Sequence, residues 1–227
     1  HLSIRRQRQM CIRDRRQKYE LCLALHTEAA EAAYLTGHFD RMERLAQIVE
    51  QRADALLDKV KACEIRVHAY FAQNKLLKSI RTALPLLRML GVTFPNKPGK
   101  LHIFLNMLVT KLALLRCSPE AISQLPEMSD PYKLAAMRLM IKMSSAAYIG
   151  LPNLLPLIGF KGVRLSLAYG NAPASTYIYS GFGMILSVFQ GDIETGYRFG
   201  ELAVHLVDRL HAEEFAARTI STANFLI

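Results

Sequence analysis

The sequence predicts an all-α protein, an α-solenoid of antiparallel helix pairs. Apolar residues recur with the 3.6-residue period of an amphipathic helix along nearly the whole chain. Val, Thr and aromatic residues, which favour strands, are sparse beside long stretches rich in Leu, Ala, Arg, Glu and Lys. Gly, Asn and Pro residues punctuate the periodic segments, and the resulting short connections predict that successive helices pack side by side in opposite directions.

Composition supports a folded chain. Hydrophobic residues make up 51% of the 227 residues and charged residues 21%, a balance that disordered segments do not have. This length allows one domain with a core of its own or a short repeat array.

The positions of Gly, Asn and Pro residues predict the helix boundaries. Gly37 and Gly91 each end a predicted helix, Asp130 caps one with Pro131 in its first turn, and VTFPNKPGK is the clearest loop. Residues 117–130 are expected to be irregular. The predicted helices cover residues 17–36, 56–73, 76–90, 100–116, 131–148, 173–189 and 192–210, and two more open near residues 38–40 and 151–153.

Three turns share one pattern of residue types. A residue that tolerates a left-handed backbone closes the first helix, and an apolar residue two positions later seats the turn. Three and then four positions further on, mostly small residues let the second helix approach the first closely. The residues at these positions are Gly37, Phe39, Met42 and Ala46; Asn74, Leu76, Ser79 and Ala83; and Gly191, Ile193, Gly196 and Gly200.

This pattern resembles the tetratricopeptide repeat in a degenerate form and implies a tetratricopeptide-like superhelix. Met42 is large where that family has a small residue. The spacing from Gly37 to Asn74 is 37 residues, whereas the repeat has about 34. A helical repeat and a strict tetratricopeptide register are therefore two separate hypotheses.

Whole segments carry a second resemblance, over roughly residues 19–215. The strings LLDKVKACEIRVHAYFAQNKLLKSI, LRMLGVTFPNKP, LPEMSDPYKLAAMRLM, LPNLLPLI and GDIETGYRFGELA resemble the helical-repeat region of large bacterial multidomain signalling proteins. In those proteins a Ser/Thr-kinase-like domain and a P-loop ATPase of the AAA or STAND type precede the helical region. A GAF domain and a histidine kinase or cyclase follow it. The resemblance implies a regulatory segment and transfers no catalytic residue to this chain.

The first sixteen residues differ from the rest. RQRQMCIRDR resembles a translated sequencing-adapter remnant, so residues 1–16 are expected to be a non-native leader. Residues 17–227 are then one helical-repeat segment, expected to be incomplete at both ends.

Charge and hydropathy argue against nucleic acid and membrane partners. Six arginines and one aspartate give residues 1–16 a net charge of +5, which leaves +5 of the total +10 for residues 17–227, with both signs interspersed. No basic stripe with interleaved aromatic residues marks a nucleic-acid interface. Two apolar segments, 101–115 and 165–191, are too short or too polar to span a bilayer, and we expect both to be buried helices of a soluble core.

The sequence contains no candidate catalytic, cofactor-binding or metal-binding residue. No phosphate-binding loop, nucleophile elbow or HExxH motif occurs. The seven histidines form no pair at a spacing of four, and Cys11, Cys22, Cys63 and Cys117 are widely spaced. We expect reduced thiols in the cytoplasm, no metal and no cofactor.

The glycines leave one question open. Nine of the twelve fall between residues 150 and 200. Glycine inside a helix costs about 1 kcal/mol relative to alanine, so either close helix packing or a hinge should offset that cost.

The sequence therefore predicts a non-catalytic scaffold or regulatory arm of a bacterial signal-transduction ATPase or sensor kinase. Its partner would be another protein or neighbouring domains of the same polypeptide. The alternative is a free-standing adaptor that binds a peptide in a concave groove, and an enzyme of unrecognised chemistry is a third class.

Overall fold

The computed structural model describes the backbone of residues 2–115 and 117–225, and the side chains of residues 18–115 and 117–225. The described residues form eleven α-helices and no strand, which confirms the all-α prediction. The helices are α1 (Leu2–Leu35), α2 (Phe39–Arg52), α3 (Asp58–Ala72), α4 (Leu76–Met89), α5 (Lys100–Leu114), α6 (Pro119–Ser123), α7 (Pro131–Gly150), α8 (Leu154–Tyr169), α9 (Pro173–Gln190), α10 (Ile193–Arg209) and α11 (Glu213–Asn224).

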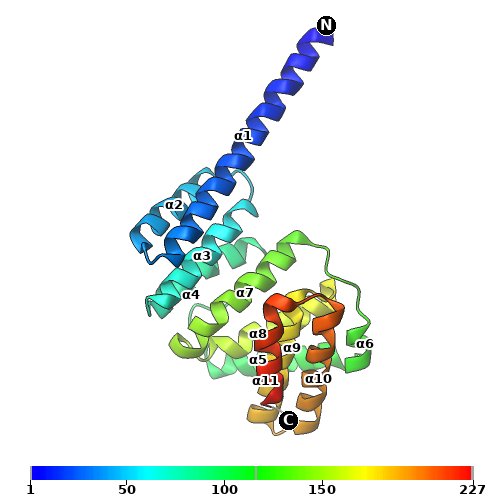
Figure 1. The fold of residues 1–227 in the computed structure, drawn as a ribbon. Coiled ribbons are helices and arrows are strands. Elements are labelled where there is room, and N and C mark those ends of the chain that lie inside the picture. The colour runs from blue at the N-terminus through cyan, green and yellow to red at the C-terminus, as the bar shows by residue number, and fades with distance from the viewer. Residues whose placement is uncertain (1, 116, 226–227) are drawn as a thin grey trace.

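Most helices pack on the next one in the chain, as short connections dictate. Contacts join α1 to α2, α2 to α3, α3 to α4, α7 to α8, α8 to α9, α9 to α10 and α10 to α11. Alternate helices also touch, because α3 lies against both α1 and α7, and α9 lies against both α7 and α11. Figure 1 shows the resulting succession of helices from one end of the chain to the other.

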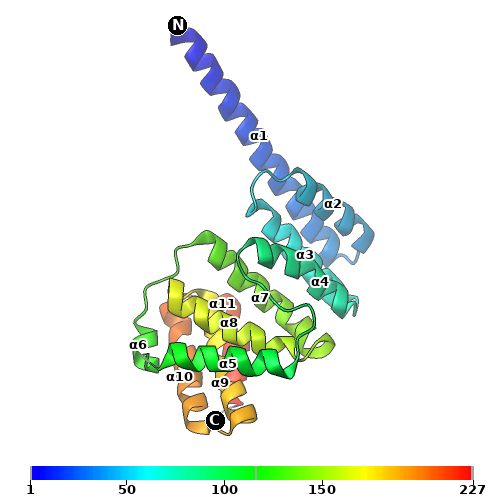
Figure 2. The same cartoon turned by 180° about the vertical axis from the view of Figure 1, so that it is seen from behind.

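Helices α5 and α6 lie outside this succession. Helix α4 packs directly on α7, although α5 and α6 separate the two along the chain. Helix α5 crosses the back of α8, as Figure 2 shows, and α6 contacts α10. The segment is anchored after α6, where the backbone N–H of Met128 donates to the carbonyl of Asn171 at 2.8 Å.

The apolar side chains form two clusters that meet at α3. Ala62, Ile65 and Ala69 pack with α1 and α2, whereas Val60 and Val67 belong to the larger cluster formed with α4 and α7–α11. Helix α3 is therefore covered on two opposite sides, which explains why its apolar residues form no single stripe in the sequence.

The N-terminal half of α1 projects away from the rest of the molecule (Figure 1). Its backbone continues the helix that we expected to begin near residue 17. The side chains of the proposed leader, residues 1–16, lie outside the described residues.

Two short elements were not predicted. Helix α6 lies within the segment expected to be irregular, and its Ser118 cap accepts a hydrogen bond from the backbone N–H of Ala121 at 3.3 Å. Helix α11 follows a left-handed residue that is not glycine, His211, with φ 47°. Histidine gives no boundary signal in sequence, whereas Gly37 and Gly91 do.

Candidate interaction surface

The predicted turn residues occupy three separate turns and form no common site. The left-handed backbone expected at Gly37, Asn74 and Gly191 is present, with φ values of 77°, 56° and 68°. At the first two turns the helix ends in the same way: the residue after the left-handed one, His38 or Lys75, donates its N–H to a carbonyl five positions back at 2.8 Å.

The apolar residue after each turn behaves differently in the third case. Phe39 and Leu76 are partly buried and pack against the two clusters. Ile193 is 66% exposed, so the expectation that it seats its turn is wrong. No helix among the described residues covers the end of the α9–α10 pair where Ile193 lies.

Gly196 and Gly200 are both buried on the side of α10 that faces the core. A Cβ atom at Gly196 would collide with Ser187 Oγ and would lie 2.7 Å from the carbonyl oxygen of Gly183 on α9. Close helix packing therefore accounts for this glycine, as the turn pattern predicted, without a hinge.

Helix α5 is the element whose position differs most from the sequence expectation. It begins after Gly99, which follows the two prolines of the VTFPNKPGK loop, and it ends at Leu114. One side packs on α8, where Thr110 is fully buried and Ile103, Met107 and Leu114 touch the large cluster.

Arg164 of α8 holds this packed side in place. Its guanidinium donates to the Thr110 hydroxyl at 2.5 Å, to the Asn106 side-chain oxygen at 2.8 Å and to the Asn106 carbonyl at 3.1 Å. Burial lowers the pKa of Arg164, so these hydrogen bonds compensate a partly desolvated charge.

The opposite side of α5 is apolar and bare. Residues 101, 105, 108, 112 and 115 follow one another at steps of four and three and so lie on a single helix face. We call these residues the α5 seam: Leu101, Leu105, Leu108, Leu112 and Leu115. Together with the flanking Phe104 and Val109 they are between 45% and 77% exposed. The expectation that residues 101–115 form a buried core helix is therefore wrong, because within the described part of the chain α5 packs along one side only, mainly on α8.

Charge is also distributed differently from what we expected. Residues 65–191 contain fourteen Lys and Arg residues and three Asp and Glu residues, a net charge of +11, whereas residues 17–64 and 192–227 each carry −3. The expectation of interspersed charge on residues 17–227 is therefore wrong at the scale of several helices. Helix α5 lies within the basic centre, and between Asp58 and Glu120 the only acidic residue is Glu64.

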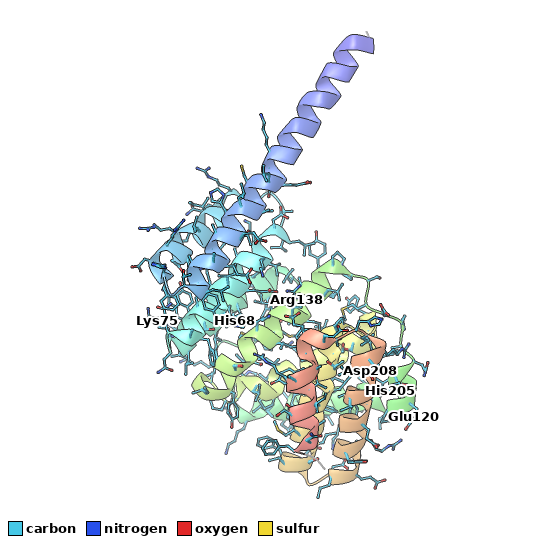
Figure 3. All side chains as sticks on the ribbon, in the orientation of Figure 1. His68, Lys75, Glu120, Arg138, His205 and Asp208 are labelled. Carbon is cyan, nitrogen blue, oxygen red and sulfur yellow. The ribbon has the colours of Figure 1, made fainter. Side chains whose placement is uncertain are left out.

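A second polar feature joins α3, α7 and α11. Glu64 is 4% exposed and accepts a hydrogen bond from Arg138 at 3.2 Å, while its other oxygen has no partner among the described residues. Burial raises the pKa of Glu64. Figure 3 shows Arg138 near His68, whose pKa burial and the nearby Lys142 lower to about 4. The junction is therefore a partly compensated buried carboxylate at the contact between α3 and α7.

A third feature is an open groove of about 460 Å³ between α6 and α10. Glu120 and Arg198 bridge it with an ion pair of 2.8 Å, and Leu202 and His205 line it. Figure 3 shows His205 and Glu120 on adjacent parts of this side of the molecule. Both bridging side chains are well exposed, so their ion pair contributes little to stability.

The described part of the chain shows no metal-binding group and no membrane-spanning helix, and the sequence matches no curated protein. Within the described residues, no three His, Cys, Asp or Glu side chains are grouped as metal ligands would be, and no helix has the length and hydropathy needed to cross a membrane. No family model matches the sequence, and no curated protein or solved structure matches it.

Proposed function

We propose that the chain is a non-catalytic helical-repeat scaffold that binds a protein partner or a neighbouring domain of its own polypeptide. The observation that carries this proposal is the bare apolar face of α5. Large contiguous apolar patches on folded proteins mark interaction sites. Six large apolar side chains on α5 and Leu115 at its C-cap, opposite a face that is already packed, form such a patch.

The packing order supports an α-solenoid of tetratricopeptide-like helix pairs. In such arrays each helix touches its neighbour and every second helix touches as well. The contacts of α3 with α1 and α7, and of α9 with α7 and α11, have this form. The interruption by α5 and α6 and the large Met42 at a turn position depart from the regular repeat.

In this proposal the chain acts as a regulatory arm of a bacterial signal-transduction ATPase or sensor kinase in the cytoplasm. Support comes from the segment resemblance described above and from the unpaired thiols of Cys22, Cys63 and Cys117. The second candidate function is a free-standing adaptor that captures a peptide, and the α6–α10 groove favours it, because it is an open cleft lined mostly by polar side chains.

A photo-cross-linking experiment tests the proposal. Benzoylphenylalanine replaces Leu108 on the seam or, as a matched control, the exposed Ala113 on the flank of α5. The chain is produced in the cells that encode it, together with whatever its reading frame encodes on either side. We expect protein adducts from position 108 and none from position 113.

The identity of the adduct separates the two candidates. Cross-linking to a flanking ATPase or kinase domain supports the regulatory arm, and cross-linking to a separate protein supports the adaptor. Equal yields at the two positions, or no adduct from position 108, would contradict a binding role for the α5 face.

A further inference from the structure

We propose that the α5 seam docks an amphipathic helix of a partner protein whose apolar stripe is flanked by Asp and Glu residues. This inference rests on the proposed function and specifies the chemistry of the partner. Two features of α5 carry it: the spacing of the seam and the charges along its edge.

The spacing selects a helix as the occupant. The seam residues Leu101, Leu105, Leu108, Leu112 and Leu115 alternate between steps of four and three, which is the a and d pattern that meets another helix in a coiled coil. A helix that lies on a lipid surface needs a strongly polar opposite side in contact with water, whereas the opposite side of α5 is packed on α8.

The lysines at the edge of the seam favour a partner helix that carries acidic residues beside its apolar stripe. Lys100 and Lys111 are both exposed and lie eleven residues apart, which is close to three helical turns, so they occupy the same edge of α5. In the heptad defined by the seam, Lys111 occupies a g position, and residues at e and g set partner choice through ion pairs between helices. No acidic residue lies on α5 to neutralise these lysines from within.

The lysines at the seam edge disfavour a second copy of this chain as the occupant. Self-association through the seam would bring the edges that carry Lys100 and Lys111 in the two copies together, with no acidic residue on α5 to pair with them. An acidic helix instead gains attraction from both lysines. Charge complementarity of this kind raises association rates and excludes partners of the wrong sign.

Two synthetic three-heptad peptides test the inference. Both carry Leu at a and d; one carries Glu at e and g and the other carries Lys there. We expect the Glu-flanked peptide to bind about tenfold or more tightly than the Lys-flanked peptide, measured by fluorescence anisotropy at low salt. Its affinity should fall as salt rises, because exposed charge pairs are screened.

Variants of the chain assign the binding to the seam. Leu108→Glu should abolish binding of the Glu-flanked peptide, whereas Ala113→Glu, which adds the same charge on the flank of the same helix, should leave it within about threefold. Lys111→Glu should weaken binding of the Glu-flanked peptide and strengthen binding of the Lys-flanked peptide. Circular dichroism melts of all three variants establish that the fold is retained.

Four outcomes would overturn the inference. They are equal affinity for the two peptides, binding that survives Leu108→Glu, seam-dependent dimerisation of the chain without peptide, and seam-dependent binding to anionic vesicles without binding to peptide. Equal affinity for the two peptides would not contradict the proposed function, because the seam would still bind helices. The absence of seam cross-links in cells contradicts the proposed function itself, so the two failures are distinguishable.

Discussion

Helices α5 and α9 have similar compositions but different surroundings. Both are strongly apolar and contain no acidic residue. Helix α9 packs on α7, α8, α10 and α11, and most of its side chains are buried, whereas α5 packs mainly on α8 and buries only Thr110 completely. The apolar content of a helix therefore does not by itself indicate whether its faces are buried against other helices or exposed to solvent.

Residue size is what distinguishes the two helices. The buried side of α9 includes Ala174, Ser175, Ser180 and Gly183, which let neighbouring helices approach from several directions. The seam of α5 consists of leucines only, which suits one partner at the ordinary distance between helices. Predictions about substitutions in the two helices test this distinction.

The largest effect should come from the aromatic centre of α9. Phe182 lies edge-on to Phe160 and Phe199, with ring centroids 6.2 Å and 4.9 Å away, and is 1% exposed. Phe182→Ala should lower the free energy of unfolding by about 3–5 kcal/mol, because it leaves a cavity. Leu108→Ala on α5 should change it by less than about 0.5 kcal/mol. Urea denaturation measures both, and a large loss for Leu108→Ala would show that the seam is already covered in the isolated chain.

The next effect concerns the attachment of α5. Arg164→Met removes the three hydrogen bonds to Asn106 and Thr110 and should cost about 2 kcal/mol. Hydrogen exchange should accelerate in α5 and stay slow in α9. Lys161→Met is the matched control, because Lys161 lies over the Phe94 ring and donates no hydrogen bond to α5 within the described part of the chain. Similar exchange in the two variants would mean that Arg164 does not hold α5.

A smaller effect compares two glycines of the α9–α10 pair. Gly196→Ala should be neutral or destabilise by up to about 2 kcal/mol, because overpacking against the Gly183 carbonyl outweighs the helix propensity gained. Gly181→Ala should stabilise by up to about 1 kcal/mol, because a Cβ atom there meets nothing within 4 Å. Thermal melts of the two variants measure the difference. Stabilisation by Gly196→Ala would favour the hinge interpretation of this glycine.

The smallest effect at neutral pH concerns a polar side chain that is only partly covered, and it grows as the pH falls. The pKa of His68 is lowered to about 4 by burial, with Lys142, Arg218 and Lys61 opposing its protonation and Glu214 favouring it. The unfolded chain therefore binds a proton at higher pH than the folded one, so His68 destabilises the fold as the pH falls from about 6.5 towards 4. His68→Gln should flatten this part of the stability profile, and the exposed His205→Gln should not. Parallel profiles for wild type and His68→Gln would contradict the shift.

Sequence patterns predicted the helices well and their surroundings poorly. Boundaries at Gly37, Gly91 and Pro131 were predictable because glycine and proline act locally on the backbone. The exposure of α5 was not, since it depends on which helix lies beside it after folding. One signal was available: the 101–115 segment has leucines at steps of four and three and almost no small residues, in contrast to 173–189.

The segment between α4 and α7, which carries α5 and α6, has an evolutionary consequence. Because α4 packs directly on α7, the helical array continues whether or not the intervening chain carries α5. Lengthening a connection costs little free energy, about 0.6 kcal/mol for each doubling. A lineage could therefore exchange α5 for another helix and so present a different surface, provided that Val92, Ile122 and Met128 stay buried where this segment joins the core.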